Sequence, residues 1–138
     1  MIAGIFDVLL HIIRSYGNSF HPLGGDKIHK ELPKLLPALE WIDGNLNDPE
    51  ISVSDIAQKI FVSEVYLRKL FHNVTGLSPI AFIQRRRIER ACIELKGTAK
   101  GIKEISGTYG FLEIPFFYRI FKQWTGKTPA QYRQGREP

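Results

Sequence analysis

Apolar residues recur at helical spacing through most of the chain, and no segment alternates apolar and polar residues as a β-strand would. The pattern predicts a helix that starts near residues 34–37, a second helix after Ser52 and a third after Ser63. A longer helix is expected from Ser78 to about Lys96, with a serine N-cap and a proline in its first turn. Loops fall at the glycine, proline and serine positions between these helices, so the fold class is all-α.

The first 31 residues are expected to stand apart from this helical domain. An apolar stripe between Ile2 and Ser15 predicts an amphipathic helix, and the breaker-rich residues 16–25 predict a linker. The stripe is too short to span a bilayer, so no membrane partner is expected. The domain boundary is placed after this linker, near residue 31. Pro37 fits only the first turn of a helix, so the first helix of the domain is expected to start near residues 34–37.

An internal repeat organises most of the remaining chain. Shifted by 50 residues, the pair Thr75–Gly76 recurs as Thr125–Gly126. The other matched pairs are Leu67 with Phe117, Phe71 with Phe121, Ser78 with Thr128, Pro79 with Pro129 and Phe82 with Tyr132. Further upstream the shift is 49, so the second copy has gained one residue in a turn. An insertion inside a helix would rotate its buried face by about 100°, and each copy is therefore a helix, a turn and a helix.

Charge is concentrated in the second half of the chain. Residues 1–62 carry 5 Lys+Arg and 8 Asp+Glu and residues 63–138 carry 14 and 6, so the halves have charges of −3 and +8, consistent with the net charge of +5. Such a basic balance is typical of a surface that binds a polyanion, and equally of a solvated basic face. The one cysteine, Cys92, excludes an internal disulfide and favours a reducing cytoplasmic setting. The four histidines show no metal-ligand spacing, so no metal or cofactor is expected.

The third predicted helix, Ser63–Thr75, presents a basic outer face. Helical spacing puts Val65, Arg68, Lys69 and His72 opposite its buried apolar stripe. A short helix, a tight turn and a second helix with such a face form the helix-turn-helix arrangement, in which the second helix can enter a DNA major groove. Two copies would provide two reading helices. The helix between them would be about 29 Å long, close to the roughly 34 Å between successive major-groove faces.

Short motifs spread over residues 34–134 carry a family resemblance. They are Asp55–Ala57, Ser63–Phe71, Thr75–Gly76, Arg87–Ala91, Ile105–Phe111, Phe117–Lys122 and Thr125–Arg133. Together they closely resemble the C-terminal signature of the AraC/XylS family of bacterial transcription regulators. The resemblance implies a seven-helix DNA-binding domain over residues 32–138. Its parts would be one helix-turn-helix lobe at about 34–76, a linker helix at about 78–97 and a second lobe at about 100–134.

The resemblance also implies which residues meet DNA. In the first lobe the family's base-contacting positions match Val65, Arg68 and Lys69, the face that helical spacing indicates independently. In the second lobe the DNA-facing positions match Ile114, Pro115, Tyr118 and Arg119. Three of these four offer only one hydroxyl for hydrogen bonds to base edges. The expected phosphate contacts are His72, Arg85, Arg86, Lys122 and Thr128.

The basic run Arg85–Arg87 cannot act as a single patch, because three consecutive helix positions span about 200°. Arg87 is expected to be structural and to pair with a carboxylate. For Arg85 and Arg86 two interpretations remain, phosphate contact and solvated charge. Cys92 is expected to be an inert, packed thiol.

The implied partners are a double-stranded DNA operator and RNA polymerase. Homodimerisation would use an upstream sensor domain, of which residues 1–31 would be the end. No catalytic motif favours an enzyme. The competing interpretation is a protein-interaction module for which DNA contact is secondary.

Overall fold

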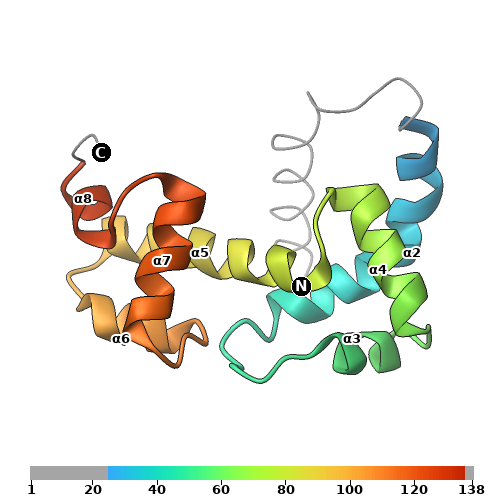
Figure 1. The fold of residues 1–138 in the computed structure, drawn as a ribbon, viewed down its shortest axis with the longest axis horizontal. Coiled ribbons are helices and arrows are strands. Elements are labelled where there is room, and N and C mark those ends of the chain that lie inside the picture. The colour runs from blue at the N-terminus through green and yellow to red at the C-terminus, as the bar shows by residue number, and fades with distance from the viewer. Residues whose placement is uncertain (1–24, 136–138) are drawn as a thin grey trace. The chain divides into compact units, whose positions relative to one another are not determined.

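The computed structural model describes residues 25–135, which form seven α-helices and no β-strand. The helices are α2 (Gly25–Asp43), α3 (Val53–Lys59), α4 (Glu64–Thr75), α5 (Pro79–Gly97), α6 (Ile102–Thr108), α7 (Ile114–Thr125) and α8 (Pro129–Gln134) (Figure 1). The all-α prediction is confirmed. The amphipathic helix expected between Ile2 and Ser15 lies outside the described residues.

The chain divides into two compact units, called the N-terminal lobe and the C-terminal lobe. The N-terminal lobe contains α2, α3, α4 and the first turn of α5, up to Phe82. The C-terminal lobe contains residues 46–50, the rest of α5 from Ile83, and α6, α7 and α8.

Within the N-terminal lobe, α2, α3 and α4 pack against one another. Ser52 caps α3 in a capping box with Asp55, and the Ser63 hydroxyl accepts a hydrogen bond from the Tyr66 N–H at the start of α4. Both predicted N-caps are confirmed. The buried apolar residues of this lobe include Leu35, Leu39, Ile42, Ile56, Leu67, Leu70, Phe71, Val74 and Phe82.

The start of α2 differs from the sequence-based expectation. The helix begins at Gly25, and it therefore includes part of the expected linker and two internal prolines, Pro33 and Pro37. Each proline removes the N–H that would bond to the carbonyl four residues earlier. Both prolines are exposed, so their rings lie on the solvent side of the helix, and the carbonyl that Pro37 releases, that of the exposed Pro33, can turn to water. The rule that restricts proline to a first turn fails here because the prolines lie on the solvent side of the helix.

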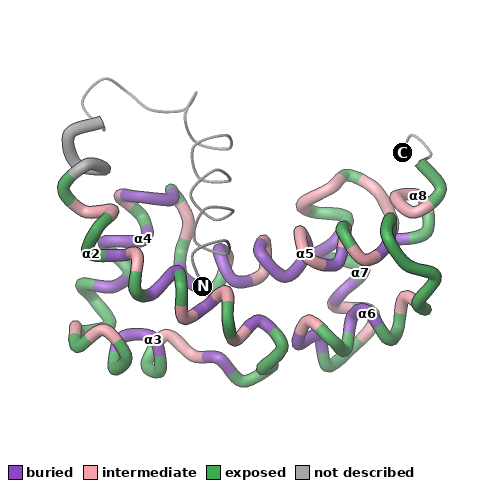
Figure 2. Tube along the Cα trace, turned by 180° about the vertical axis from the view of Figure 1, so that it is seen from behind, coloured by how far each residue is buried: buried purple, intermediate pink, exposed green. Residues whose placement is uncertain are grey.

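The C-terminal lobe has an aromatic core. Its buried members are Ile88, Ala91, Leu95, Ile105, Phe111, Phe117, Ile120 and Phe121. Phe117 lies edge-on to Phe111, with ring centroids 4.9 Å apart, and Phe121 meets Tyr132 in the same way at 5.7 Å. Buried residues recur along the length of α5 (purple in Figure 2), which contributes one side of this core.

The two copies of the repeat end their second helix identically. The Thr75 hydroxyl donates to the Phe71 carbonyl at 2.7 Å and accepts from the Leu77 N–H at 3.1 Å. Thr125 makes the equivalent bonds to Phe121 and Lys127 at 2.8 and 3.1 Å. The glycine that follows each threonine takes a left-handed conformation, with φ of 74° and 75°.

The turn inside each helix-turn-helix also requires a positive φ, and the two lobes meet this requirement differently. Gly110 has φ of 81° in the C-terminal lobe, whereas Phe61 has φ of 58° at the equivalent position of the N-terminal lobe. A side chain in this region costs roughly 1–2 kcal/mol. Phe61 is 93% exposed, so no packing of its ring within the lobe offsets that strain.

Gly110 is required for space as well as for conformation. A Cβ atom there would lie 2.9 Å from Cζ of Arg87 and 3.0 Å from the carbonyl oxygen of Leu46. Gly126, which has nearly the same φ, has no heavy atom within 4 Å of its hypothetical Cβ. Substitutions at Gly126 therefore test backbone strain alone, whereas substitutions at Gly110 test backbone strain together with steric exclusion.

We expect Gly110→Ala to destabilise the protein far more than Gly126→Ala. Gly126→Ala should cost about 1 kcal/mol of unfolding free energy, the penalty for a left-handed alanine. Gly110→Ala should cost about 2–4 kcal/mol, because overpacking adds roughly 1–3 kcal/mol to the same penalty. Urea unfolding followed by circular dichroism measures both, and equal losses would show that the Arg87 guanidinium moves aside freely.

Candidate nucleic-acid interface

The outer face of α4 presents the residues expected to contact bases. Val65 is 76% exposed, and Arg68, Lys69 and His72 are exposed on the same side of the helix. Leu67, Leu70 and Phe71 on the opposite side are buried against the rest of the lobe, and this packing fixes the rotation of α4 about its axis. The structure therefore brings all four expected residues onto one solvent-facing surface.

The outer face of α7 is less polar. Pro115, Tyr118, Arg119 and Lys122 are exposed, and Ile114 is half-buried at the first helical position. The Arg119 guanidinium lies 5.1 Å from the centroid of the Phe116 ring, a cation–π contact that holds it against the helix surface.

The turn that precedes α7 contains the residue gained by the second copy of the repeat. The N–H of Val62 donates to the Ala57 carbonyl, and the N–H of Phe111 donates equivalently to Ser106. Ser63 and Glu113 are the next equivalent residues, because Ser63 is the N-cap of α4 and Glu113 is the N-cap of α7. The additional residue is therefore Leu112, and its side chain is 80% exposed.

One of the expected phosphate contacts, that of Arg86, is wrong, and that of Thr128 stays a prediction for its hydroxyl alone. The Arg86 side chain is only 2% exposed and pairs with Glu89 at 2.7 Å, so it is neither solvated nor open to a phosphate. The backbone N–H of Thr128 donates to the Gln131 side chain at 2.9 Å, and the Thr128 hydroxyl accepts from the Gln131 N–H. This capping box uses the N–H that was expected to meet a phosphate. The spacing of Thr128 and Gln131 is the capping-box signature and was visible in the sequence. The burial of Arg86 was not, because it depends on how α5 packs.

The other two arginines of the run are also held by the protein. Arg87 has the expected structural role, but its guanidinium donates to the backbone carbonyls of Leu46 and Asp48, and the Asp48 carboxylate acts on it only through its charge. Arg85 lies over the Trp124 ring, 5.1 Å from its centroid, and 3.5 Å from a carboxylate oxygen of Glu89. It remains partly exposed, and its phosphate contact stays a prediction.

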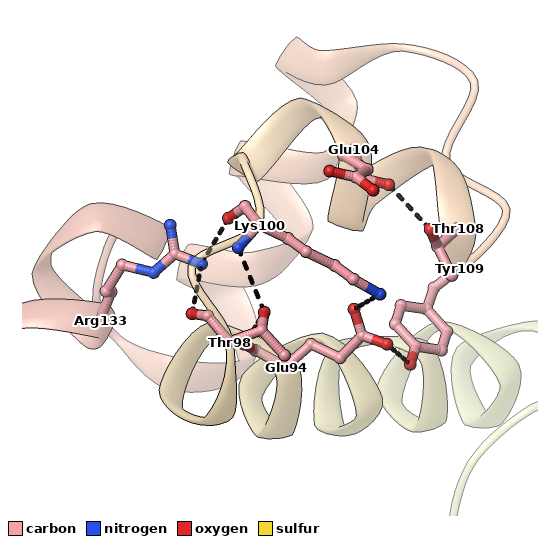
Figure 3. Close-up of polar contacts among 7 residues, drawn as sticks. All are labelled: Glu94, Thr98, Lys100, Glu104, Thr108, Tyr109 and Arg133. Atoms are coloured by element: carbon pink, nitrogen blue, oxygen red, sulfur yellow. Dashed lines mark hydrogen bonds and ion pairs between the residues drawn. The ribbon is translucent and has the colours of Figure 1, made fainter.

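A second arginine, Arg133, holds the α5–α6 loop by hydrogen bonds to backbone carbonyls, as Arg87 holds residues 46–50. Arg133 of α8 donates from Nε to the Leu95 carbonyl at 3.0 Å and from Nη2 to the Lys100 carbonyl at 2.6 Å. Its position relative to Thr98 and Lys100 is visible in Figure 3. Sequence reasoning missed this contact. The sequence does contain a signal. Arg87 follows Pro79 by eight residues, and Arg133 follows the matched Pro129 by four residues. Because these two offsets differ by about one helical turn, both arginines lie on the same face of their helices.

Glu94 joins the same loop to α6. Its two carboxylate oxygens meet the Tyr109 hydroxyl at 2.8 Å and the Lys100 ammonium at 3.6 Å (Figure 3). Burial, and then the hydrogen bond donated to Glu94, raise the pKa of Tyr109 to about 12. These contacts position α6, which packs against α7.

Other chemistry is not assembled on the described residues. Burial raises the pKa of the Cys92 thiol to about 11, so it stays protonated at neutral pH, in keeping with an inert packed thiol. Within residues 25–135 no group of three His, Cys, Asp or Glu side chains is arranged to hold a metal ion. No helix in that range is long and apolar enough to cross a membrane.

Comparisons with known proteins agree with this geometry. A helix-turn-helix domain model matches residues 56–135. The Transposon Tn10 TetD protein of Escherichia coli is 37% identical over 98 residues, which are 71% of this chain and 70% of that protein. A solved AraC-type transcriptional regulator from Chromobacterium violaceum is 30% identical with a TM-score of 0.73, over 78% of this chain and 96% of that one. The chain belongs to the AraC/XylS family.

The described residues form the C-terminal DNA-binding domain of an AraC/XylS regulator, as the resemblance implied. The Transcriptional regulator Rob of Salmonella typhimurium is 35% identical over 99 residues, which are 72% of this chain but 34% of that protein. The chain therefore spans about a third of the length of Rob.

Because of the Tyr109–Glu94 contact, the unfolding free energy of the AraC/XylS domain should depend on pH in the alkaline range. The folded state favours the protonated phenol, because the pKa of Tyr109 rises from about 10 to about 12. The stabilisation is complete below pH 10 and is lost as the pH rises toward 12. We expect Tyr109→Phe to lower the unfolding free energy by about 1 kcal/mol at pH 8, and the difference from the native protein should shrink above pH 10.

Urea unfolding at several pH values between 8 and 12 measures this difference. Tyr66→Phe, which changes an exposed tyrosine of the N-terminal lobe, is the matched control and should behave like the native protein. A Tyr109→Phe deficit that stays constant up to pH 12 would show that the hydrogen bond to Glu94 does not set the titration.

Proposed function

We propose that this chain binds double-stranded DNA at specific sequences and thereby regulates transcription. Its two recognition helices, α4 and α7, would occupy successive major-groove segments. The observation that carries this proposal is the outer face of α4, where three cationic or titratable side chains surround an exposed valine and none of the four is used in packing. The matching face of α7 has its own exposed cations, Arg119 and Lys122.

The N-terminal lobe is proposed to read bases through hydrogen bonds. Arg68 and Lys69 can donate to O6 and N7 of guanine, and Val65 can contact the methyl group of thymine. His72 lies one helical turn beyond Arg68, where a phosphate contact is expected.

The C-terminal lobe is proposed to act mainly as an anchor on the DNA backbone. Ile114, Pro115 and Tyr118 provide one hydroxyl among three side chains. Arg119 and Lys122 are then the strong donors of this face, and both suit phosphate. Arg85 is a further candidate because part of its side chain is exposed.

The expected cellular context follows from the family. RNA polymerase is the proposed protein partner, and dimerisation is proposed to use an upstream sensor domain that precedes the DNA-binding domain. The protein is proposed to act in the cytoplasm on the bacterial nucleoid.

Salt-dependent binding to duplex DNA tests the proposal. A protein that neutralises phosphates should lose affinity steeply, with log K falling by about 0.9 per phosphate for each unit of log salt concentration. Fluorescence anisotropy with duplexes recovered by selection from a randomised library measures the slope. A protein-interaction module would show neither enrichment of a sequence nor this salt dependence.

Two substitutions separate the roles of the lobes. Arg68→Ala should relax the preference at one or two base positions and cost about 1–3 kcal/mol on the best site. Lys122→Ala should weaken all sequences alike and reduce the salt slope by about one unit. Both residues are exposed, so neither change should alter the unfolding free energy.

Repeating the library selection with each variant decides the assignment. A sharp motif in the half-site of the C-terminal lobe that disappears with Arg119→Ala, together with an unchanged motif for Arg68→Ala, would reverse it. Hydrogen-bonded base recognition would then belong to α7.

A further inference from the structure

An apolar patch marks the start of the second recognition helix. It comprises Leu112, Ile114, Pro115 and Tyr118, of which Leu112 is 80% exposed and Tyr118 36% exposed. Ile114 and Tyr118 are four residues apart on α7 and are therefore surface neighbours, as are Pro115 and Tyr118. Leu112, Pro115 and Tyr118 are exposed and lie away from the lobe's core, which includes Phe117, Ile120 and Phe121. Ile114 is half-buried and lies at the border between the core side and the exposed side of α7.

The N-terminal lobe has a different surface at the matched positions. Glu64 and Arg68 stand where Ile114 and Tyr118 stand in the C-terminal lobe, and Leu112 has no counterpart because it is the residue gained in the turn. At these two matched positions the C-terminal lobe has apolar side chains where the N-terminal lobe has charged ones. The buried apolar positions of α4 and α7 match one another, Leu67 with Phe117, Leu70 with Ile120 and Phe71 with Phe121. An exposed leucine adds no packing to the lobe, so the fold does not account for it.

The cations around the patch indicate what covers it. Arg119 follows Tyr118 directly, and Lys122 lies one helical turn beyond it, both exposed. An apolar patch flanked by cations matches a surface with anionic edges and apolar groups between them. The major groove has this chemistry, with phosphates at its edges and the C5-methyl group of thymine as the apolar group that it exposes.

We infer that the apolar patch recognises thymine methyl groups in the half-site bound by the C-terminal lobe. This inference rests on the proposed function and adds a base preference that needs no hydrogen bond. Each methyl group buried against Leu112 or Ile114 should strengthen binding about fourfold, which corresponds to about 0.8 kcal/mol. The lobe would then favour thymine-containing sequences while its cations hold the backbone.

Deoxyuridine tests the inference because it differs from thymidine only by the missing methyl group. The duplex recovered by library selection is resynthesised with deoxyuridine at one thymine position at a time, and its affinity for the full chain is measured by fluorescence anisotropy. We expect about a fourfold loss at one or more thymines in the half-site of the C-terminal lobe. Leu112→Ser and the double variant Leu112→Ser, Ile114→Ser should bind the thymine and uracil duplexes with nearly equal affinity at those positions.

Val65→Ser in the N-terminal lobe is the matched control. It should abolish uracil sensitivity only in the other half-site, so the two variants also assign the half-sites to the lobes. Circular dichroism verifies folding, and the single Leu112→Ser change alters an exposed loop residue.

Three outcomes would overturn the inference. The half-site of the C-terminal lobe could contain no thymine, uracil in that half-site could leave the affinity unchanged, or the loss of affinity with uracil could persist in the Leu112 and Ile114 variants. Failure of the proposed function is distinguishable from these, because the protein would then enrich no duplex and show no salt-dependent binding.

Discussion

The buried guanidinium of Arg87 is the constraint on which the C-terminal lobe depends. A buried charge is tolerated only where its donors are satisfied, and Arg87 donates to the carbonyls of Leu46 and Asp48. Desolvation lowers the pKa of Arg87, while the charge of Asp48 opposes that shift. The same guanidinium lies against the turn that leads into α7, where only glycine fits, at Gly110. One side chain thus fixes both residues 46–50 and the entry to the second recognition helix.

Most of the local structure could be predicted from the sequence, because short-range rules decide it. Ser52 and Ser63 are N-caps, and Gly76 ends α4 as its position after the apolar stripe predicts. The start of α2 could not be predicted, since the penalty for an internal proline depends on whether the released carbonyl reaches water. The fate of Arg86 was equally hidden. Its partner Glu89 is three residues away in sequence, but rotamer and burial decide whether such neighbours bond. The bond between Thr128 and Gln131, by contrast, follows the capping-box spacing.

The candidate interface was predictable in position and less so in character. Helical spacing placed Val65, Arg68 and Lys69 outside, because the buried stripe of α4 leaves no other face for them. In α7 the same logic located the face, yet the structure was needed to identify Leu112 as the residue gained in the turn. The change of register in the repeat showed that one residue had been gained, and the paired hydrogen bonds of Val62 and Phe111 identified which one.

The contrast between the two faces has a physical consequence for how sequence is discriminated. A side chain that reads bases by hydrogen bonds, the role proposed for Arg68, penalises a wrong base strongly, because its desolvated donors are left unpaired. An apolar reader loses only the contact area of a methyl group, so its discrimination per base is weaker, and it leaves no buried polar group unsatisfied. A domain that combines both can demand certain bases in one half-site while tolerating variation in the other. The repeat permits this division because the outer positions of α4 and α7 contribute little to packing, and they can diverge without cost to the fold.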